Sequence, residues 1–105
     1  MTTFDDREHA FEAKFAHDEE MRFKAQARCN KILGLWAAAK MGKAGDEADD
    51  YAKTLVAADI EDADHEDVVR KVTADLQGRV TSEEIRQKRA EFLPTAKKQI
   101  LSEVS

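Results

Sequence analysis

The residues best suited to bind a metal ion or attack a substrate are three histidines and one cysteine. His9 and His17 are eight residues apart, about 12 Å along a helix, which is too far to share an ion. Cys29 has no recognisable base partner and falls on an apolar helix face, so it is predicted to be a small core residue. The CxxC, HExxH, EF-hand and di-metal carboxylate motifs are absent from the sequence. We therefore predict no enzyme activity and no catalytic residues.

The third histidine, His65, stands in an acidic run that begins before it and continues after it. Its neighbours are Asp62, Asp64, Glu66 and Asp67. Carboxylates at this density can bind a divalent cation weakly. The simpler interpretation is a solvated loop that runs into the start of a helix, with Asp64 as the N-cap. We adopt that interpretation and predict no metal site.

Residues 1–20, called the arm below, hold a second group of side chains whose spacing indicates binding. Phe4, Phe11 and Phe15 fall on one narrow stripe of a helix, with Glu8 and Glu12 beside it. Ordering some 20 residues costs about 1–2 kcal/mol each, which far exceeds the ~2–3 kcal/mol that each buried ring contributes. We expect the arm to be frayed or disordered alone and to fold on a partner that covers the rings. The alternative is that the rings fold back onto the rest of the chain.

The net charge of −5 is concentrated in the arm. Residues 1–20 carry seven acids and two bases, while residues 21–105 carry 15 of each. An acidic arm on a neutral body argues against nucleic acid and anionic membranes, and favours a basic or mixed protein surface. The single cysteine suits a reducing compartment, and no apolar run approaches the ~18 residues of a membrane span. We therefore expect a cytoplasmic protein that does not insert into a membrane.

The elements that must position the arm are predicted to be helices. Four glycines and one proline in 105 residues favour an all-α domain, and the apolar periodicity indicates a small four-helix bundle over residues 21–105. The predicted helices span about 22–41, 46–59, 65–77 and 82–103. Gly34 inside the first helix is predicted to let another helix approach closely. The apolar faces are predicted to comprise Ala25, Cys29, Ile32, Leu33, Trp36 and Ala39; Ala48, Tyr51, Ala52, Leu55 and Val56; Val68, Val69, Val72 and Leu76; and Ile85, Phe92, Leu93, Ala96, Ile100 and Leu101.

The ends of the helices differ in how clearly they are marked. Thr81 and Glu84 form a capping box, and Val80 with Ile85 forms a hydrophobic staple. Pro94 predicts a kink in the last helix, or an end near residue 92 with a short terminal helix after it. At residues 18–22 the apolar stripe is interrupted by charge, which fits either a hinge or a long helix with a solvated middle.

Several sequence blocks resemble the zeta subunit of alphaproteobacterial F-type ATP synthases, an ATPase inhibitor family once described as a domain of unknown function. They are the FDDRE opening, the KFAHD block, the LGLWAA segment and the stretch GDEADDYAKTLVAADIEDADHEDVVRKV, so the resemblance spans essentially the whole chain. The family pattern has a basic pair before an asparagine, where this chain has Arg28, Cys29 and Asn30. Pro94 is a second departure, and it bears on the geometry of the last helix.

The resemblance implies a four-helix body and an N-terminal segment that inhibits the F1-ATPase. That segment would enter the catalytic interface between the alpha and beta subunits near gamma, fold there as a helix and block rotation. Carried over by position, the inserting residues would be Phe4, Asp5, Asp6, Arg7, Glu8, Phe11, Glu12, Lys14 and Phe15.

The resemblance also bears on cofactors, location and assembly. It implies weak ATP or ADP binding, but no phosphate-binding loop is present, so no cofactor is expected and no nucleotide-binding residue is assigned. A monomeric free protein is expected, bound at the cytoplasmic face of the inner membrane when on the synthase. The alternative function is a non-inhibitory helical adaptor that binds a protein through the bundle surface and senses adenine nucleotide weakly.

Overall fold

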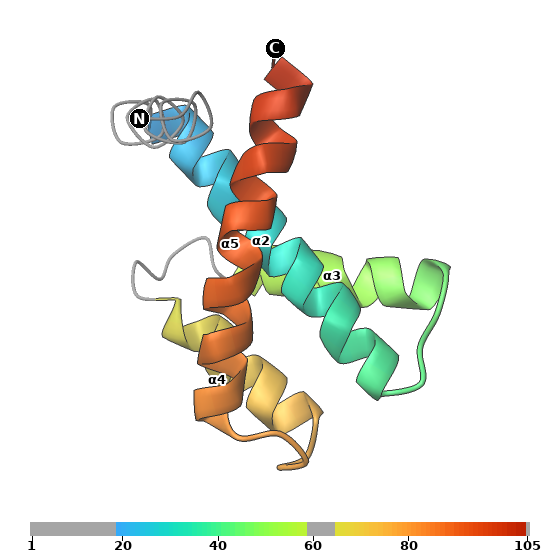
Figure 1. Cartoon of the computed structure of the whole chain (residues 1–105). Helices are drawn as coiled ribbons and strands as arrows, with labels where there is room; N and C mark the ends of the chain where they lie inside the picture. The colour runs from blue at the N-terminus through green and yellow to red at the C-terminus, as the bar shows by residue number, and fades with distance from the viewer. Residues whose placement is uncertain (1–18, 59–64, 105) are drawn as a thin grey trace.

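Four α-helices make up the part of the chain that the structure, a computed structural model, describes: residues 19–58 and 65–104. They are α2 (Glu19–Lys40), α3 (Asp46–Ala58), α4 (Glu66–Asp75) and α5 (Ser82–Val104) (Figure 1). Within these residues there is no strand, so the predicted all-α fold with four helices is confirmed. The first helix begins at Glu19, earlier than the start predicted near residue 22. None of the described helices is long and apolar enough to cross a membrane.

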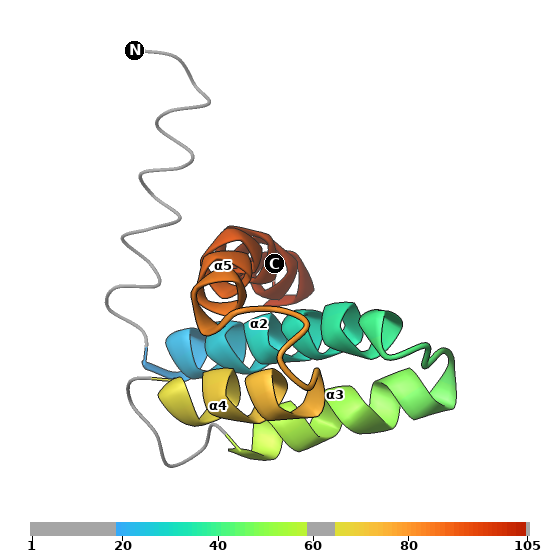
Figure 2. The same ribbon diagram turned by 90° about the horizontal axis from the view of Figure 1, so that it is seen from below.

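The helix α2 lies at the centre of the assembly. It packs most extensively against α3 and α5, and Figure 2 shows α5 on one side of α2 with α3 and α4 on the opposite side. Because α2 is covered on two sides, its buried residues are spread around the helix, from Met21 and Ala25 to Ala37 and Ala38. Sequence periodicity predicted a single buried face, and the placement of Ala39 on that face was wrong, because Ala39 is exposed.

The main core joins all four helices. It consists of Leu33, Ala37, Leu55, Val68, Val69, Val72, Leu76, Val80 and Ile85. The face predicted for α4 is fully confirmed, since all four of its valine and leucine side chains are buried. In α3 the buried side chains are Ala48, Ala52 and Leu55, while Tyr51 is partly buried against the core. In α5 the buried side chains include Ile85, Ala96 and Ile100, and Phe92 packs against the main core from its edge.

Gly34 is the point of closest approach between α2 and α3. A β-carbon on Gly34 would lie 2.6 Å from the Cα atom of Ala52 and 2.9 Å from its Cβ atom. Real β-carbons do not approach neighbouring atoms this closely, so the two backbones meet where neither helix has room for a larger residue. The predicted role of Gly34 is confirmed.

The start of α5 has the predicted cap, but Pro94 does not end this helix. The backbone N–H of Glu84 donates to Thr81 Oγ1 at 3.1 Å, and Val80 and Ile85 are both buried, as a hydrophobic staple requires. The helix continues through Pro94 to Val104, so the predicted end near residue 92 is wrong. Pro94 and Ala90 are exposed, and water can therefore satisfy the carbonyl that lacks a proline N–H. A kink at this position stays a prediction.

The start of α4 also differs from the prediction. The N-cap is His65, which adopts the left-handed conformation with φ 62°. The predicted cap, Asp64, lies outside the described residues. Asparagine, aspartate and histidine are all enriched in this conformation. Because aspartates stand next to His65, local sequence could not show which residue would adopt it.

Candidate partner-binding site

The residues predicted to enter a partner lie outside the part of the chain that the structure describes. All nine of them, from Phe4 to Phe15, precede Glu19. The structure describes residues 19–29 of α2, called the root below, which include the last two residues of the arm and the helix that continues from them. Of the predicted junction at residues 18–22, the described part from Glu19 to Arg22 is helical.

The outer side of the root begins with exposed ion pairs within the helix. Glu19 lies 3.8 Å from Arg22, and Glu20 lies 3.2 Å from Lys24. Pairs three or four residues apart, with the acid nearer the N-terminus, stabilise a helix by about 0.2–0.5 kcal/mol each. The two acids also suit the positive end of the helix dipole. The first turns of α2 are thus supported partly by local contacts.

Phe23 is the exposed large hydrophobic side chain of the described residues. Its exposed fraction is 61%, and it lies on the root between Arg22 and Lys24, the two bases of these ion pairs. The predicted binding stripe of Phe4, Phe11 and Phe15 did not include Phe23, which is displaced from these residues by about 80–120° around a helix. The sequence signal that could have identified Phe23 is an aromatic residue between two charged residues of a predicted helix. Phe23 extends the set of candidate contact residues onto the body.

The inner side of the root packs against the last turns of α5. Met21, Ala25 and Ile100 form a small buried cluster, with Leu101 beside it. Arg28 adds polar contacts at the other end of the root. Its Nη1 donates to Gln99 Oε1 at 2.8 Å, and its Nη2 donates to Glu103 Oε1 at 2.5 Å. The root is therefore held to α5 at two levels.

A buried polar layer separates this small cluster from the main core. Arg89 is only 9% exposed; its Nε donates to Asn30 Oδ1 at 2.9 Å and its Nη2 to Gln26 Oε1 at 2.5 Å. Asn30 is fully buried. Cys29 is also fully buried, as predicted, and its Sγ donates to the Arg89 carbonyl at 3.3 Å.

Arg89 was not among the predicted residues, although the sequence carries a signal for it. Arg89 falls on the same helical stripe as Ile85, Ala96 and Ile100, where a charged residue is unexpected. An arginine on an apolar stripe indicates either a buried polar partner or a binding role. The structure supplies the partners, Asn30 and Gln26, from α2.

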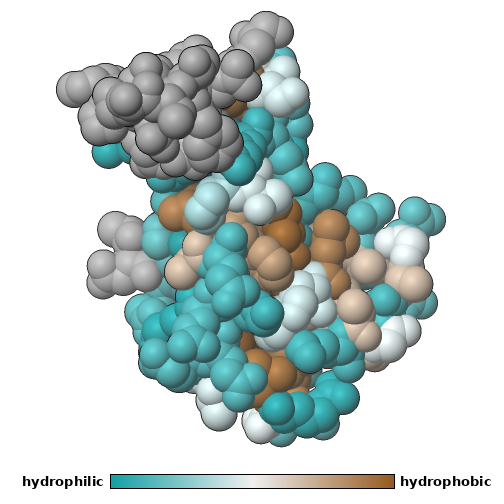
Figure 3. Space-filling view, in the orientation of Figure 1, coloured by the Kyte–Doolittle hydropathy of each residue, from teal (hydrophilic) through white to brown (hydrophobic). Residues whose placement is uncertain are grey.

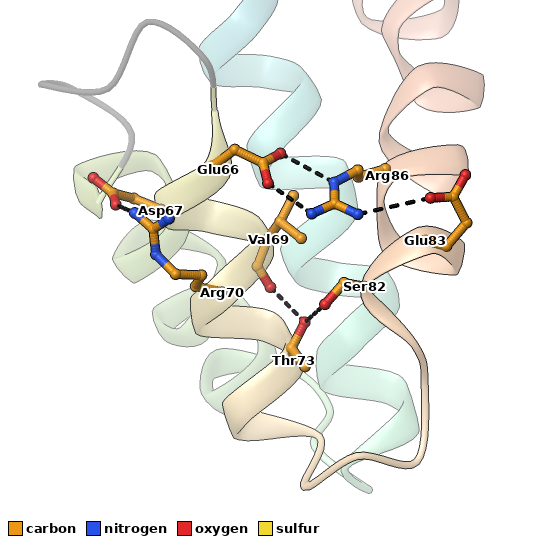
Figure 4. Close-up of polar contacts among 8 residues, drawn as sticks. All are labelled: Glu66, Asp67, Val69, Arg70, Thr73, Ser82, Glu83 and Arg86. Carbon is orange, nitrogen blue, oxygen red and sulfur yellow. Dashed lines mark hydrogen bonds and ion pairs between the residues drawn. The ribbon is translucent and has the colours of Figure 1, made fainter.

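The opposite end of α5 is held to α4 by a different set of polar contacts, shown in Figure 4. Arg86 binds both carboxylate oxygens of Glu66, at 2.7 and 3.1 Å, and lies 3.7 Å from Glu83. The Thr73 hydroxyl donates to the Val69 carbonyl at 2.7 Å and lies 3.1 Å from the Ser82 hydroxyl. These contacts are remote from the root along α5, and they provide a comparison for the Arg28 contacts.

Tyr51, Lys71 and Asp75 form a third polar group, between α3 and α4. The Tyr51 hydroxyl and the Lys71 ammonium both donate to Asp75 Oδ2, at 2.8 and 2.9 Å. Burial, the hydrogen bond to Asp75 and the charge of Asp75 raise the pKa of Tyr51 far above its usual value. Burial acts to raise the pKa of Asp75, but the hydrogen bonds from Lys71 and Tyr51 and the charge of Lys71 outweigh it and lower this pKa.

Asp75 is expected to make stability depend on pH in the acid range. Because its pKa is lower in the folded state than the ~3.9 of the unfolded chain, its contribution is present above about pH 4 and is lost as the pH falls through the folded pKa. Asp75→Asn should lose about 1 kcal/mol at pH 7 and show a smaller further loss on acidification. Urea unfolding of both proteins at pH 6 and pH 3 measures this. Equal acid losses would contradict the prediction.

The described residues contain no group of three or more His, Cys, Asp or Glu side chains that could hold a metal ion. The acidic run around His65 is only partly covered, since Asp62 and Asp64 lie outside the described residues.

The space-filling view shows how polar and apolar residues are distributed on one face of the molecule. Hydrophilic residues cover most of that face, and smaller hydrophobic areas lie between them (Figure 3). This distribution fits a protein whose apolar residues are mostly used in its own core.

Comparison with known proteins finds a protein family and solved structures to which the chain is similar. The family model of the ATPase inhibitor subunit zeta matches residues 1–99. A solved structure described as "Solution NMR structure of the protein" is 51% identical, with a TM-score of 0.73, and the match covers 79% of this chain and 98% of that one. No curated protein matches the sequence. The family match includes the arm and the root, and it ends one residue before Ile100.

Proposed function

The chain belongs to the ATPase inhibitor subunit zeta family, and from that membership we propose that its arm inhibits the F1-ATPase by folding as a helix in a catalytic interface. The family is one of regulatory rather than catalytic proteins. The proposed interface lies between the alpha and beta subunits beside gamma, and the proposed contacts are the nine residues from Phe4 to Phe15. The observation that carries the proposal is the family match that begins at residue 1 and so includes the whole arm.

The helical root supports this mode of action. The first turn of an isolated helix is unfavourable to form, whereas adding residues to an existing helix is not. Because α2 is already helical from Glu19, an arm that folds on the enzyme can extend it without a new nucleus. Burial of three phenylalanine rings at about 2–3 kcal/mol each then offsets part of the cost of ordering the backbone. A helix wedged beside gamma would stop the rotation that hydrolysis drives.

Removal of residues 1–18 tests the proposal directly. The truncated protein, which begins at Glu19, is expected to lose inhibition of F1-ATPase activity and to keep its helical content and its unfolding transition. Among the described residues the main core is formed by side chains between Leu33 and Ile85, all of which the truncated protein keeps, so the body is expected to remain folded. Steady-state ATP hydrolysis with increasing inhibitor, together with circular dichroism, measures both properties. Undiminished inhibition by the truncated protein would overturn the proposal.

Single substitutions in the full-length chain make the same test without shortening it. Phe11→Ala and Phe15→Ala should each weaken inhibition by about tenfold or more, because each removes a ring whose burial contributes about 2–3 kcal/mol. The matched control is Gln87→Ala, at an exposed position on α5, which should inhibit like the unaltered protein.

The exposure of Phe23 favours a second candidate, an adaptor that binds a protein partner through the bundle. In that case Phe23→Ser would abolish binding to the F1 sector, whereas removal of residues 1–18 would not. Since Phe23 is 61% exposed, the substitution should change the stability of the fold by less than about 0.5 kcal/mol. Binding assays with the two variants therefore separate an inhibitor that acts through its arm from an adaptor.

A further inference from the structure

The last described turn of α5 covers the root of the arm, although the family match ends before this turn. The match stops at residue 99, whereas Ile100, Leu101 and Glu103 contact the root. Ile100 is 4% exposed and packs with Met21 and Ala25, which are 5% and 1% exposed. The contacts that hold the root are therefore made partly by residues outside the family match.

We propose that Gln99, Ile100, Leu101 and Glu103, called the α5 brace below, position the arm by holding the root in a fixed direction. This inference rests on the proposed function, because it assigns the brace a role in presenting the inhibitory arm. The brace residues do not contact the enzyme in this scheme. They act through α2.

The geometry of Arg28 makes the brace directional. Gln99 and Glu103 are four residues apart, so their side chains are neighbours on one face of α5. The guanidinium of Arg28 presents its donors in a rigid planar fork and bonds to both side chains at once. Such a contact restricts the rotation of α2 about its axis as well as its distance from α5.

The apolar contact lies at the other end of the root. Met21 and Arg28 are seven residues apart, about 10 Å along the helix, so the root is held at two separated points. Two such points fix the direction of a helix, whereas one would leave it free to pivot. The brace supplies both from the last turns of α5.

Direction matters because the arm is long. If its 18 residues before Glu19 become helical, they extend about 27 Å, and a 10° error at the root displaces the tip by about 5 Å. A fixed root also lowers the conformational freedom that is lost when the arm binds. Loss of the brace is therefore expected to weaken inhibition while every arm residue is still present.

Exchange of the two charges tests the brace in the full-length chain. Arg28→Glu and Glu103→Arg should each weaken inhibition by about fivefold to tenfold, since preorganisation rather than contact area is lost. The double variant with both substitutions should inhibit within about twofold of the unaltered protein, because the ion pair is restored in reverse. Arg28→Lys should weaken inhibition by about threefold, because lysine lacks the planar guanidinium that bonds to both acceptors at once.

A matched control separates positioning from general stability. Arg86→Glu breaks a comparable ion pair with Glu66 at the other end of α5 and should leave inhibition unchanged. Thermal unfolding of each variant shows that it is folded at the assay temperature. If Arg28→Glu does not fold, Arg28→Lys and Glu103→Gln decide the result.

Single variants that inhibit like the unaltered protein would overturn the proposed role of the brace, and so would a double variant that does not recover. Weakening by Arg86→Glu to the same extent would also do so, because the effect would then follow stability alone. The protein that lacks residues 1–18 distinguishes failure of the brace from failure of the proposed function. If the truncated protein does not inhibit while the brace variants inhibit normally, only the proposed role of the brace is wrong. If the truncated protein still inhibits, the proposed function is wrong.

Discussion

Replacement of Gly34 with alanine is expected to lower the free energy of unfolding by about 2 kcal/mol, although alanine is the better helix former. In an open helix the same change would stabilise by about 1 kcal/mol. Here the new methyl group would lie 2.6 Å from the Cα atom of Ala52, a backbone atom that cannot move without shifting α3. Overpacking of this kind costs about 1–3 kcal/mol, and larger residues at position 34 should cost more.

Urea unfolding, followed by circular dichroism, measures this change against two other variants. Ala39→Gly, at an exposed position of the same helix, should destabilise by about 1 kcal/mol through helix propensity alone. The double variant Gly34→Ala with Ala52→Gly removes the methyl group of residue 52 but leaves its backbone in the way of the new methyl group, so it should recover only part of the loss. A Gly34→Ala protein as stable as the unaltered one would show that α2 and α3 do not approach this closely.

Replacement of Arg89 with alanine is expected to destabilise the protein by about 3 kcal/mol. The substitution removes a nearly buried guanidinium that donates to Asn30 Oδ1 and Gln26 Oε1. Asn30 is fully buried, so its amide oxygen would lose a buried, charge-assisted hydrogen bond. The cavity left by the long side chain adds to the loss.

An apolar replacement of the layer provides the comparison. The double variant Asn30→Leu with Arg89→Met keeps similar volumes and leaves neither polar group behind. It should be more stable than Arg89→Ala by at least about 1 kcal/mol, because removing both partners costs less than leaving one unsatisfied. Thermal and urea unfolding of the two proteins test this. A double variant that is less stable than Arg89→Ala would contradict the expectation that losing one side of this buried contact costs more than replacing both sides.

Local features of the sequence were sufficient to predict the helices and most of the core. The capping box at Thr81 depends on residues within four positions, so tertiary structure was not needed to find it. The buried valine face of α4 could also be predicted from local sequence, because this helix buries one main side and its periodicity shows which side that is. The resemblance based on the FDDRE, KFAHD and LGLWAA blocks was confirmed by the family match over residues 1–99.

Predictions failed where a residue's environment is set by a distant segment. Ala39 has an apolar side chain but no neighbour among the described residues that buries it, whereas Asn30 is polar and fully buried because α5 crosses α2 at that level. The continuation of α5 through Pro94 likewise depends on which side of the helix faces solvent. The nine arm residues remain a prediction, because they precede the described part of the chain.

The sequence by itself thus determined a helical domain, the cap at Thr81, the concentration of negative charge in residues 1–20 and membership of an inhibitor family. These follow from periodicity, charge and short motifs, which need no knowledge of distant neighbours. The tertiary structure alone decided that α2 is central, that Phe23 is exposed, and that Arg28 joins Gln99 and Glu103 across more than 70 residues of chain. The reason is physical: a side chain's burial and partners depend on which helix is packed against it, and that packing is settled only when all the helices are in place.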